Sequence, residues 1–139
     1  MSARDSFTRA AEAFNRRDHQ AFAALYAVDA IVRDPIYPQP LTGRDAIEQD
    51  MVDFFRAFSD ARFTVGRVLE DGQTVAGEFS ISGTHTGPLA LPDGEIPATG
   101  KPLTFEGAAF SLFNAQGEIV EEHRYYDLAG QLAQLGLSQ

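Results

Sequence analysis

The sequence predicts an α+β domain in which N-terminal helices cover one face of a strongly bent antiparallel sheet. Apolar residues recur at helical spacing as far as Ser59 and alternate after Asp60, as they do on strands with one covered face. Glycines interrupt the expected strands at Gly66, Gly77, Gly83 and Gly107. Glycines inside strands indicate bulges or kinks, so we expect the sheet to curl and to enclose a cavity against the helices.

The first two helices and a short strand are expected in the N-terminal third. Helical spacing predicts a helix over residues 3–15 with Ser2 as its N-cap, and a shorter helix over residues 20–26 capped by Asp18. Residues 30–33 are β-prone and precede Asp34-Pro35, where the proline ends any helix.

A third helix is expected over residues 44–59. Its apolar stripe consists of Ile47, Met51, Phe54, Phe55 and Phe58. Thr42 followed by Asp45 resembles a capping box with aspartate in the place of glutamate. This helix therefore lays an aromatic face against the sheet.

Four long strands and a last helix complete the expected fold. The strands span residues 63–70, 75–86, 103–113 and 118–126, and the helix spans residues 128–135. Asp127 directly precedes that helix and is a favoured N-cap. Residues 88–99 hold three prolines between two strands and predict a rim loop or a lid.

The composition of the chain limits the classes of function that it can have. The chain has 139 residues, 44% of them hydrophobic, which suits a single domain with one core. A net charge of −9 argues against a nucleic-acid partner and against an anionic membrane surface. With no cysteine, disulfides and thiolate chemistry are excluded. The N-terminus lacks a signal-peptide core and no run is long enough to span a bilayer, so a cytoplasmic protein is expected.

Four sequence motifs resemble one known family. They are DAIVRDPIYPQPLTGRDAI at 29–47, GTHTG at 83–87, TGKPLTF at 99–105 and GEIVEEHRYYDLAGQLAQLG at 117–136. Together with the order of helices and strands, they resemble the SnoaL-like polyketide cyclase and ester-cyclase group of the nuclear transport factor 2-like superfamily, which includes ketosteroid isomerase. The resemblance covers residues 1–139 and implies one cone-shaped domain.

The resemblance also marks two departures from the cyclase pattern. In the cyclases an acidic residue three positions before the final aspartate faces the pocket, and here Arg124 stands at that position. A guanidinium does not exchange its proton near neutral pH. The cyclases also carry a pocket histidine on the preceding strand, where this chain has Phe110. If Arg124 points inward, strand alternation sends Glu122 and Tyr126 inward as well.

Four residues are candidates for catalysis: Arg124, Glu106, His85 and Asp127. Glu106 shares the face assigned to Phe110 and is expected to meet Arg124, either as a structural ion pair or as a base. His85 either reaches the pocket mouth or bonds to a turn. Asp127 either caps the last helix or contacts a ligand at the rim.

The remaining candidates line the pocket. The expected ligand-binding residues are Tyr26, Asp34, Tyr37, Phe54, Phe58, Phe110 and Tyr126. The tyrosines suit hydrogen bonds to a carbonyl or enolate oxygen, and the phenylalanines suit a flat apolar molecule. Asp34 also reads as a turn former before proline. Glu121 and His123 supply only two metal ligands, so neither a metal nor a cofactor is expected.

The function expected from the resemblance and the site is cofactor-independent acid–base chemistry on a cyclic or polyketide-like carbonyl compound: cyclisation, isomerisation or dehydration. The alternatives are a non-catalytic domain that binds a hydrophobic ligand or a protein, and an epoxide hydrolase. Relatives of this fold pair through the outer face of the sheet, which implies a homodimer. Ala109, Ser111 and Phe113 are the expected exterior positions.

Overall fold

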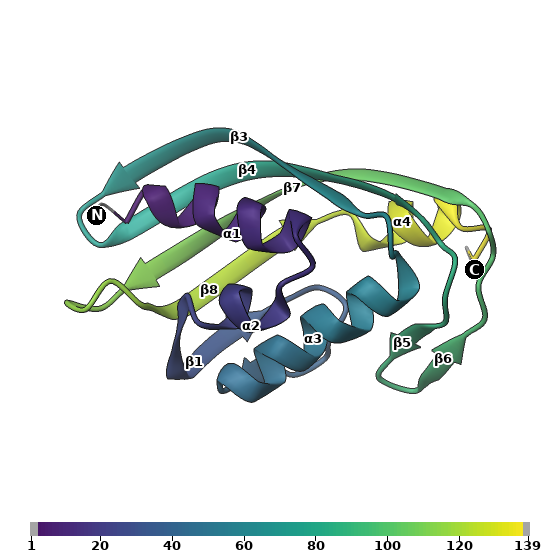
Figure 1. Cartoon of the computed structure of the whole chain (residues 1–139), viewed down its shortest axis with the longest axis horizontal. Helices are drawn as coiled ribbons and strands as arrows, with labels where there is room; N and C mark the ends of the chain where they lie inside the picture. Colours follow the sequence, from purple (N-terminus) through teal and green to yellow (C-terminus); the bar gives the residue numbers. More distant parts are fainter. Residues whose placement is uncertain (1–2, 138–139) are drawn as a thin grey trace.

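A long sheet curves along the molecule and carries the helices on its inner side (Figure 1). A computed structural model describes residues 3–137, and within them the sheet has six strands in the order β2-β1-β8-β7-β4-β3. β1 runs parallel to β8, and the other neighbouring strands are antiparallel. The prediction of an α+β fold with helices on a strongly bent sheet is confirmed.

The helices match the expected ones closely. They are α1 (Asp5–Asn15), α2 (His19–Ala23), α3 (Arg44–Ala57) and α4 (Leu128–Gln134). Asp18 caps α2 as predicted, because its Oδ1 accepts a hydrogen bond from the Ala21 N–H at 3.0 Å. The predicted cap Ser2 lies outside the described residues.

Two boundaries differ from the prediction because pairing between strands competes with the helices. Tyr26, expected to end the second helix, is the first residue of β1 and lies opposite Ile119. The predicted capping box at Thr42 is wrong, because Thr42 belongs to β2 and lies opposite Ile31. Gly43 takes the N-cap position of α3 instead, with φ of 94° and no side-chain cap.

The four long strands are confirmed, and shorter ones accompany them. The strands are β1 (Tyr26–Arg33), β2 (Leu41–Thr42), β3 (Arg62–Asp71), β4 (Thr74–Thr84), β7 (Pro102–Phe113) and β8 (Ile119–Tyr126). The predicted rim segment contains the hairpin of β5 (Leu89–Leu91) and β6 (Gly94–Ile96). The pairing of β3 with β4 shifts between Val65 and Val68, next to Gly66, which agrees with the bulge expected from that glycine.

The faces of β7 are the reverse of the prediction. Glu106 and Phe110, expected in the pocket, are exposed on the outer side of the sheet. Ala109, Ser111 and Phe113, expected on the exterior, are buried. The predicted side-chain directions on β7 are therefore wrong.

A single irregularity in the pairing of β7 with β8 explains this reversal. Phe113 lies opposite Ile119, and a regular continuation of that register would place Ala108 opposite Arg124. The register instead shifts by one residue directly after this pair, so that Ala109 lies opposite Arg124. Because side chains alternate with a period of two, a shift of one residue exchanges the two faces of a strand relative to its neighbour.

Hydrogen bonds connect the GTHTG segment (residues 83–87) to the end of α3 and to the residues that follow it. The backbone N–H groups of Thr86 and Gly87 both donate to the Ala57 carbonyl, at 3.0 and 3.1 Å. Thr84 N–H donates to the Asp60 carboxylate at 2.8 Å. The backbone at Gly87 comes so close to α3 that an added Cβ would lie 2.0 Å from the Arg56 carbonyl oxygen.

No helix within residues 3–137 has both the length and the apolar character needed to cross a bilayer.

Replacing Gly87 with alanine is expected to lower the free energy of unfolding by about 2–3 kcal/mol, since the new methyl group collides with rigid backbone. Urea unfolding followed by circular dichroism measures the change. Gly83→Ala is the matched control in the same motif, where the added Cβ meets its nearest atoms at 3.3 Å. Equal midpoints for the two variants would contradict the close approach at Gly87.

Candidate active site

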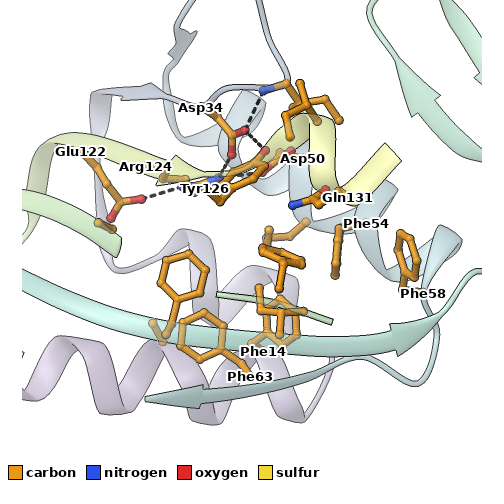
Figure 2. A pocket seen from close by; sticks show the side chains of 18 of the residues that line it. Phe14, Asp34, Asp50, Phe54, Phe58, Phe63, Glu122, Arg124, Tyr126 and Gln131 are labelled. Atoms are coloured by element: carbon orange, nitrogen blue, oxygen red, sulfur yellow. Dashed lines mark hydrogen bonds and ion pairs between the residues drawn. The ribbon is translucent and has the colours of Figure 1, made fainter. Parts of the chain in front are cut away.

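An aromatic cavity lies between the sheet and the helices α1, α3 and α4. Its volume is about 130 Å³. Its apolar wall includes the rings of Phe7, Phe14, Phe54, Phe58, Phe63, Phe79 and Phe105. Figure 2 shows polar side chains gathered at one end of this cavity and phenylalanine rings around the rest of it. The cavity therefore suits a small flat molecule with one polar end.

Arg124 is the centre of the polar end. Its Nη1 lies 3.1 Å from Asp34 Oδ2 and 3.0 Å from Asp50 Oδ2, and its Nε lies 2.8 Å from Glu122 Oε2. The four side chains are only 7–11% exposed. We call Arg124, Asp34, Asp50 and Glu122 the arginine cluster.

Three separate parts of the chain bring the arginine cluster together. Glu122 and Arg124 stand two residues apart on β8, so both point to the cavity. Asp34 follows β1 and accepts a hydrogen bond from the Ile36 N–H at 3.1 Å, which fixes it in a turn before β2. Asp50 lies on α3 three residues after buried Ile47, so it shares the inner side of the helix.

Hydroxyl groups surround the three carboxylates. Tyr26 and Ser111 each donate to Glu122 at 2.8 Å. Tyr37 donates to Asp50 Oδ1 at 2.6 Å, and Tyr126 donates to Asp34 Oδ1. Burial raises the pKa values of the three tyrosines far above their usual value, so the phenols keep their protons and act as donors.

The arginine cluster holds one guanidinium and three carboxyl groups, so full ionisation would give it a net charge of −2. Burial works to lower the pKa of Arg124, but Tyr26 and the three carboxylates raise that pKa well above its usual value, and the guanidinium stays charged. Such an excess of negative charge in a buried site favours protonation of one carboxyl group.

Asp50 accepts the fewest hydrogen bonds of the three carboxyl groups. It accepts two hydrogen bonds, from Tyr37 and Arg124. Asp34 accepts three, and Glu122 also accepts three. Fewer donors stabilise a carboxylate less. Burial, reinforced by the charge of Asp34, raises the pKa of Asp50, while Arg124 and Tyr37 work against that rise.

Most of the predicted ligand-binding residues reach the cavity. Arg124 points inward as expected, and the other predicted residues in its wall are Tyr26, Asp34, Phe54, Phe58 and Tyr126. Tyr37 lies one step away, bonded to Asp50. The predicted alternation of β8 is confirmed.

The predicted contact between Glu106 and Arg124 is wrong. Glu106 lies opposite Ser80 of β4 with its side chain exposed, and Phe110 on the same outer face is 50% exposed. The shifted register of β7 turns both residues away from the cavity. The carboxylates that satisfy Arg124 come from Asp34, Asp50 and Glu122 instead.

His85 is buried but does not line the cavity. Its ring stacks on Phe58, with 5.3 Å between the ring centroids, and His85 is not among the residues that line the cavity. Its Nδ1 accepts the Thr99 N–H at 3.2 Å and lies 2.9 Å from Thr99 Oγ1. Burial lowers the pKa of His85. Of the two alternatives for His85, the structure supports the bond to a turn, which joins the two ends of the β5–β6 segment.

Asp127 caps α4, which is one of the two roles predicted for it. Its Oδ1 accepts a hydrogen bond from the Gly130 N–H at 2.9 Å, and the side chain is exposed and outside the cavity wall.

Glu121 and His123, the two side chains considered as metal ligands, lie 3.1 Å apart on the outer face of β8. Among residues 3–137, no three His, Cys, Asp or Glu side chains are arranged to hold a metal ion.

Asp50 is the main site residue that sequence reasoning missed. A signal for it was present, because Asp50 interrupts the apolar side of α3 between Ile47 and Phe54. A lone carboxylate on a buried helix face needs a cationic partner. Glu122 was expected to point inward but was not recognised as a partner of Arg124.

The fold and the cavity define the protein as a ketosteroid isomerase-like α+β domain. The model of the SnoaL-like polyketide cyclase family matches residues 5–135, so the chain belongs to this family. No curated protein matches the sequence.

Several solved structures are similar to this chain. IdmH of Streptomyces antibioticus, a proposed polyketide cyclase, is 26% identical with a TM-score of 0.77, covering 98% of this chain and 99% of its own. A proposed polyketide cyclase of Pseudomonas putida is 25% identical with a TM-score of 0.77, covering 96% and 98%. A ketosteroid isomerase-like protein of Catenulispora acidiphila, solved with trimethylamine, is 22% identical with a TM-score of 0.78, covering 96% and 93%.

Replacing Arg124 with glutamine is expected to lower the free energy of unfolding at pH 7 by about 3–5 kcal/mol, because three buried carboxyl groups lose their cation. Without the cation, burial raises their pKa values in the folded state above the unfolded ones. The loss therefore grows as pH rises and shrinks toward pH 5. Urea unfolding at several pH values measures it.

Arg67→Gln is the matched control for this experiment. Arg67 pairs with Glu78 at 2.9 Å, but both side chains are exposed and the pair contributes little. We expect its unfolding midpoint to equal that of the wild type at every pH. An Arg124→Gln midpoint that also stayed unchanged would show that the cluster does not depend on the guanidinium.

Proposed function

We propose that the protein catalyses cofactor-independent acid–base chemistry on a small cyclic or polyketide-like carbonyl compound, by cyclisation, isomerisation or dehydration. The observation that carries the proposal is a pair of buried carboxyl groups, Asp50 and Asp34, both bonded to one guanidinium nitrogen at the polar end of an aromatic cavity. In the proposed mechanism Asp50 carries the proton and Asp34 is the base. Two carboxyl groups whose environments favour opposite protonation states form an acid–base pair.

The proton movements follow from the hydrogen bonds of the two groups. Asp50 donates its proton to the carbonyl oxygen of the substrate, and Asp34 accepts the proton from the carbon next to that carbonyl. The product of this step is a neutral enol, and the total charge of the site does not change. Return of a proton from Asp34 to another carbon, while the enol O–H gives its proton back to Asp50, completes an isomerisation. In a cyclisation, the enol carbon attacks a second carbonyl whose oxygen takes the proton from Asp34, and the enol O–H again returns its proton to Asp50.

Arg124 has a positioning role in this scheme. Its Nη1 bonds to both Asp34 and Asp50, which holds the two carboxyl groups on one side of the guanidinium. Glu122 holds the Nε of the same guanidinium. Pre-organised geometry of this kind lowers the cost of bringing acid, base and substrate together.

Exchange of hydrogen for deuterium tests the proposal without the physiological substrate. In D₂O the wild type is expected to accelerate deuterium incorporation next to the carbonyl of 1-indanone, a flat cyclic ketone, as measured by NMR. Asp50→Asn keeps the shape but loses the transferable proton, so the rate should fall about 100-fold or more. Glu106→Gln is the matched control on the outer face and should keep the wild-type rate.

Other outcomes of this experiment would redirect the assignment. Equal rates for the wild type and Asp50→Asn would contradict the role of Asp50. Binding of 1-indanone without any acceleration of exchange by the wild type would favour a non-catalytic ligand-binding domain.

The shared guanidinium also favours a second candidate, an epoxide hydrolase. Asp50 would protonate the epoxide oxygen while Asp34 takes a proton from the attacking water, so that a diol forms. Hydration of indene oxide in H₂¹⁸O, with no exchange of 1-indanone, would favour this candidate over the first.

We also propose that the protein forms a homodimer in the cytoplasm through the outer face of the sheet. The actual exterior residues of that face include Phe110, Leu112 and Tyr125, which are 50%, 40% and 55% exposed. Phe110 and Tyr125 lie edge to face with their rings 6.0 Å apart, so they form a contiguous apolar surface.

Light scattering tests this assembly. The wild type is expected to have the mass of a dimer at micromolar concentration, and Phe110→Glu should convert it to a monomer by placing a charge in the contact. Gln20→Glu, at an exposed position of α2 on the other side of the sheet, should leave the mass unchanged. A monomeric wild type would contradict the proposal.

A further inference from the structure

The guanidinium at the end of the cavity is already occupied by the protein. Four of its five N–H groups donate to protein oxygens: Nε to Glu122, Nη1 to Asp34 and to Asp50, and Nη2 to the Tyr26 hydroxyl. Recognition of a carboxylate by arginine uses two parallel N–H groups. Arg124 therefore does not have the free pair of donors that an anionic ligand requires.

The rest of the cavity wall offers no other cation. Within residues 3–137, the charged residues that line it are those of the arginine cluster. With a proton on Asp50, the cluster carries one positive and two negative charges. An anion that entered the polar end would lie in a site of low dielectric where acidic groups outnumber the single guanidinium, and it would be repelled.

We propose that the cavity selects an uncharged ligand that places an oxygen acceptor at its polar end, next to Asp50, and that it rejects anions of the same shape. This inference rests on the proposed function, because it uses the same proton on Asp50. It narrows the substrate class to neutral ketones, esters or ethers that carry no free carboxylate at the end that enters the cavity.

The hydroxyl groups at the polar end support an acceptor rather than a donor as ligand. The Tyr37, Tyr126, Tyr26 and Ser111 hydroxyls each donate to a carboxylate oxygen of the cluster. The donors left for a ligand oxygen are thus the proton of Asp50, the remaining Nη2 hydrogen of Arg124 and the side-chain amide of Gln131, which also lines the cavity (Figure 2). A neutral carbonyl or ether oxygen accepts from these groups without adding charge to the site.

Several groups act on the proton of Asp50 at once. Arg124, Glu122 and Tyr126 face the cluster from β8, Asp34 and Tyr37 from the segment after β1, and Asp53 stands one turn further along α3. The ligand binds to the form of the protein in which Asp50 is protonated. Its affinity is therefore highest at low pH and falls as the pH rises through the pKa of Asp50.

Probes of nearly identical shape separate charge from fit. We would titrate acetophenone, benzoate and benzamidinium into the wild type at pH 6 and pH 9 and follow binding by protein NMR. At pH 6, acetophenone should bind at least about tenfold more tightly than benzoate. Its affinity should fall at pH 9. Equal or tighter binding of benzoate would overturn the inference, and so would tighter binding of benzamidinium, which would indicate a site for cations.

Asp50→Asn provides the matched variant. Its amide N–H still donates to an acceptor but does not titrate, so acetophenone should bind with the same affinity at both pH values. Circular dichroism at both values verifies that the variant is folded. If the variant and the wild type lose affinity equally at pH 9, Asp50 is not the donor and the inference fails.

This experiment measures binding, whereas the exchange of 1-indanone measures turnover. Selective binding of acetophenone without exchange would contradict the proposed function and leave the selectivity in place. Exchange together with equal binding of benzoate would contradict the selectivity and leave the proposed function in place.

Discussion

The buried charge of Arg124 is the constraint on which the rest of the site depends. A guanidinium at this depth is stable only with carboxylate partners, and the protein supplies them from β8, from the turn after β1 and from α3. These elements are far apart in the sequence. The ion pairs therefore join the first strand, the third helix and the last strand at one end of the cavity.

The number of partners has a chemical consequence. One carboxylate would balance the guanidinium, whereas this site has three. Burial, reinforced by the charge of Asp34, raises the pKa of Asp50, which favours its protonated form. Arg124 does not itself exchange protons near neutral pH. The neighbouring group whose pKa is raised is Asp50 on α3, so such a cation can still be part of an acid–base site.

The sequence anticipated much of this arrangement. Alternation along β8 correctly placed Glu122, Arg124 and Tyr126 on the cavity side, because a regular strand has a period of two. The prediction for β7 failed because the register shifts by one residue next to Phe113. Asp50 was overlooked because its neighbours on the inner face of α3 are apolar, and such a face indicates the hydrophobic core and not a polar site.

By itself, the sequence determined the order of the helices and the long strands, the aromatic character of the cavity and the family. These properties depend on local periodicity and on motifs, which one chain displays directly. Only the tertiary structure decided which carboxylates meet Arg124 and which face of β7 lines the cavity. Both depend on strand register and on contacts between distant segments, and a shift of one residue is enough to exchange an inward side chain for an outward one.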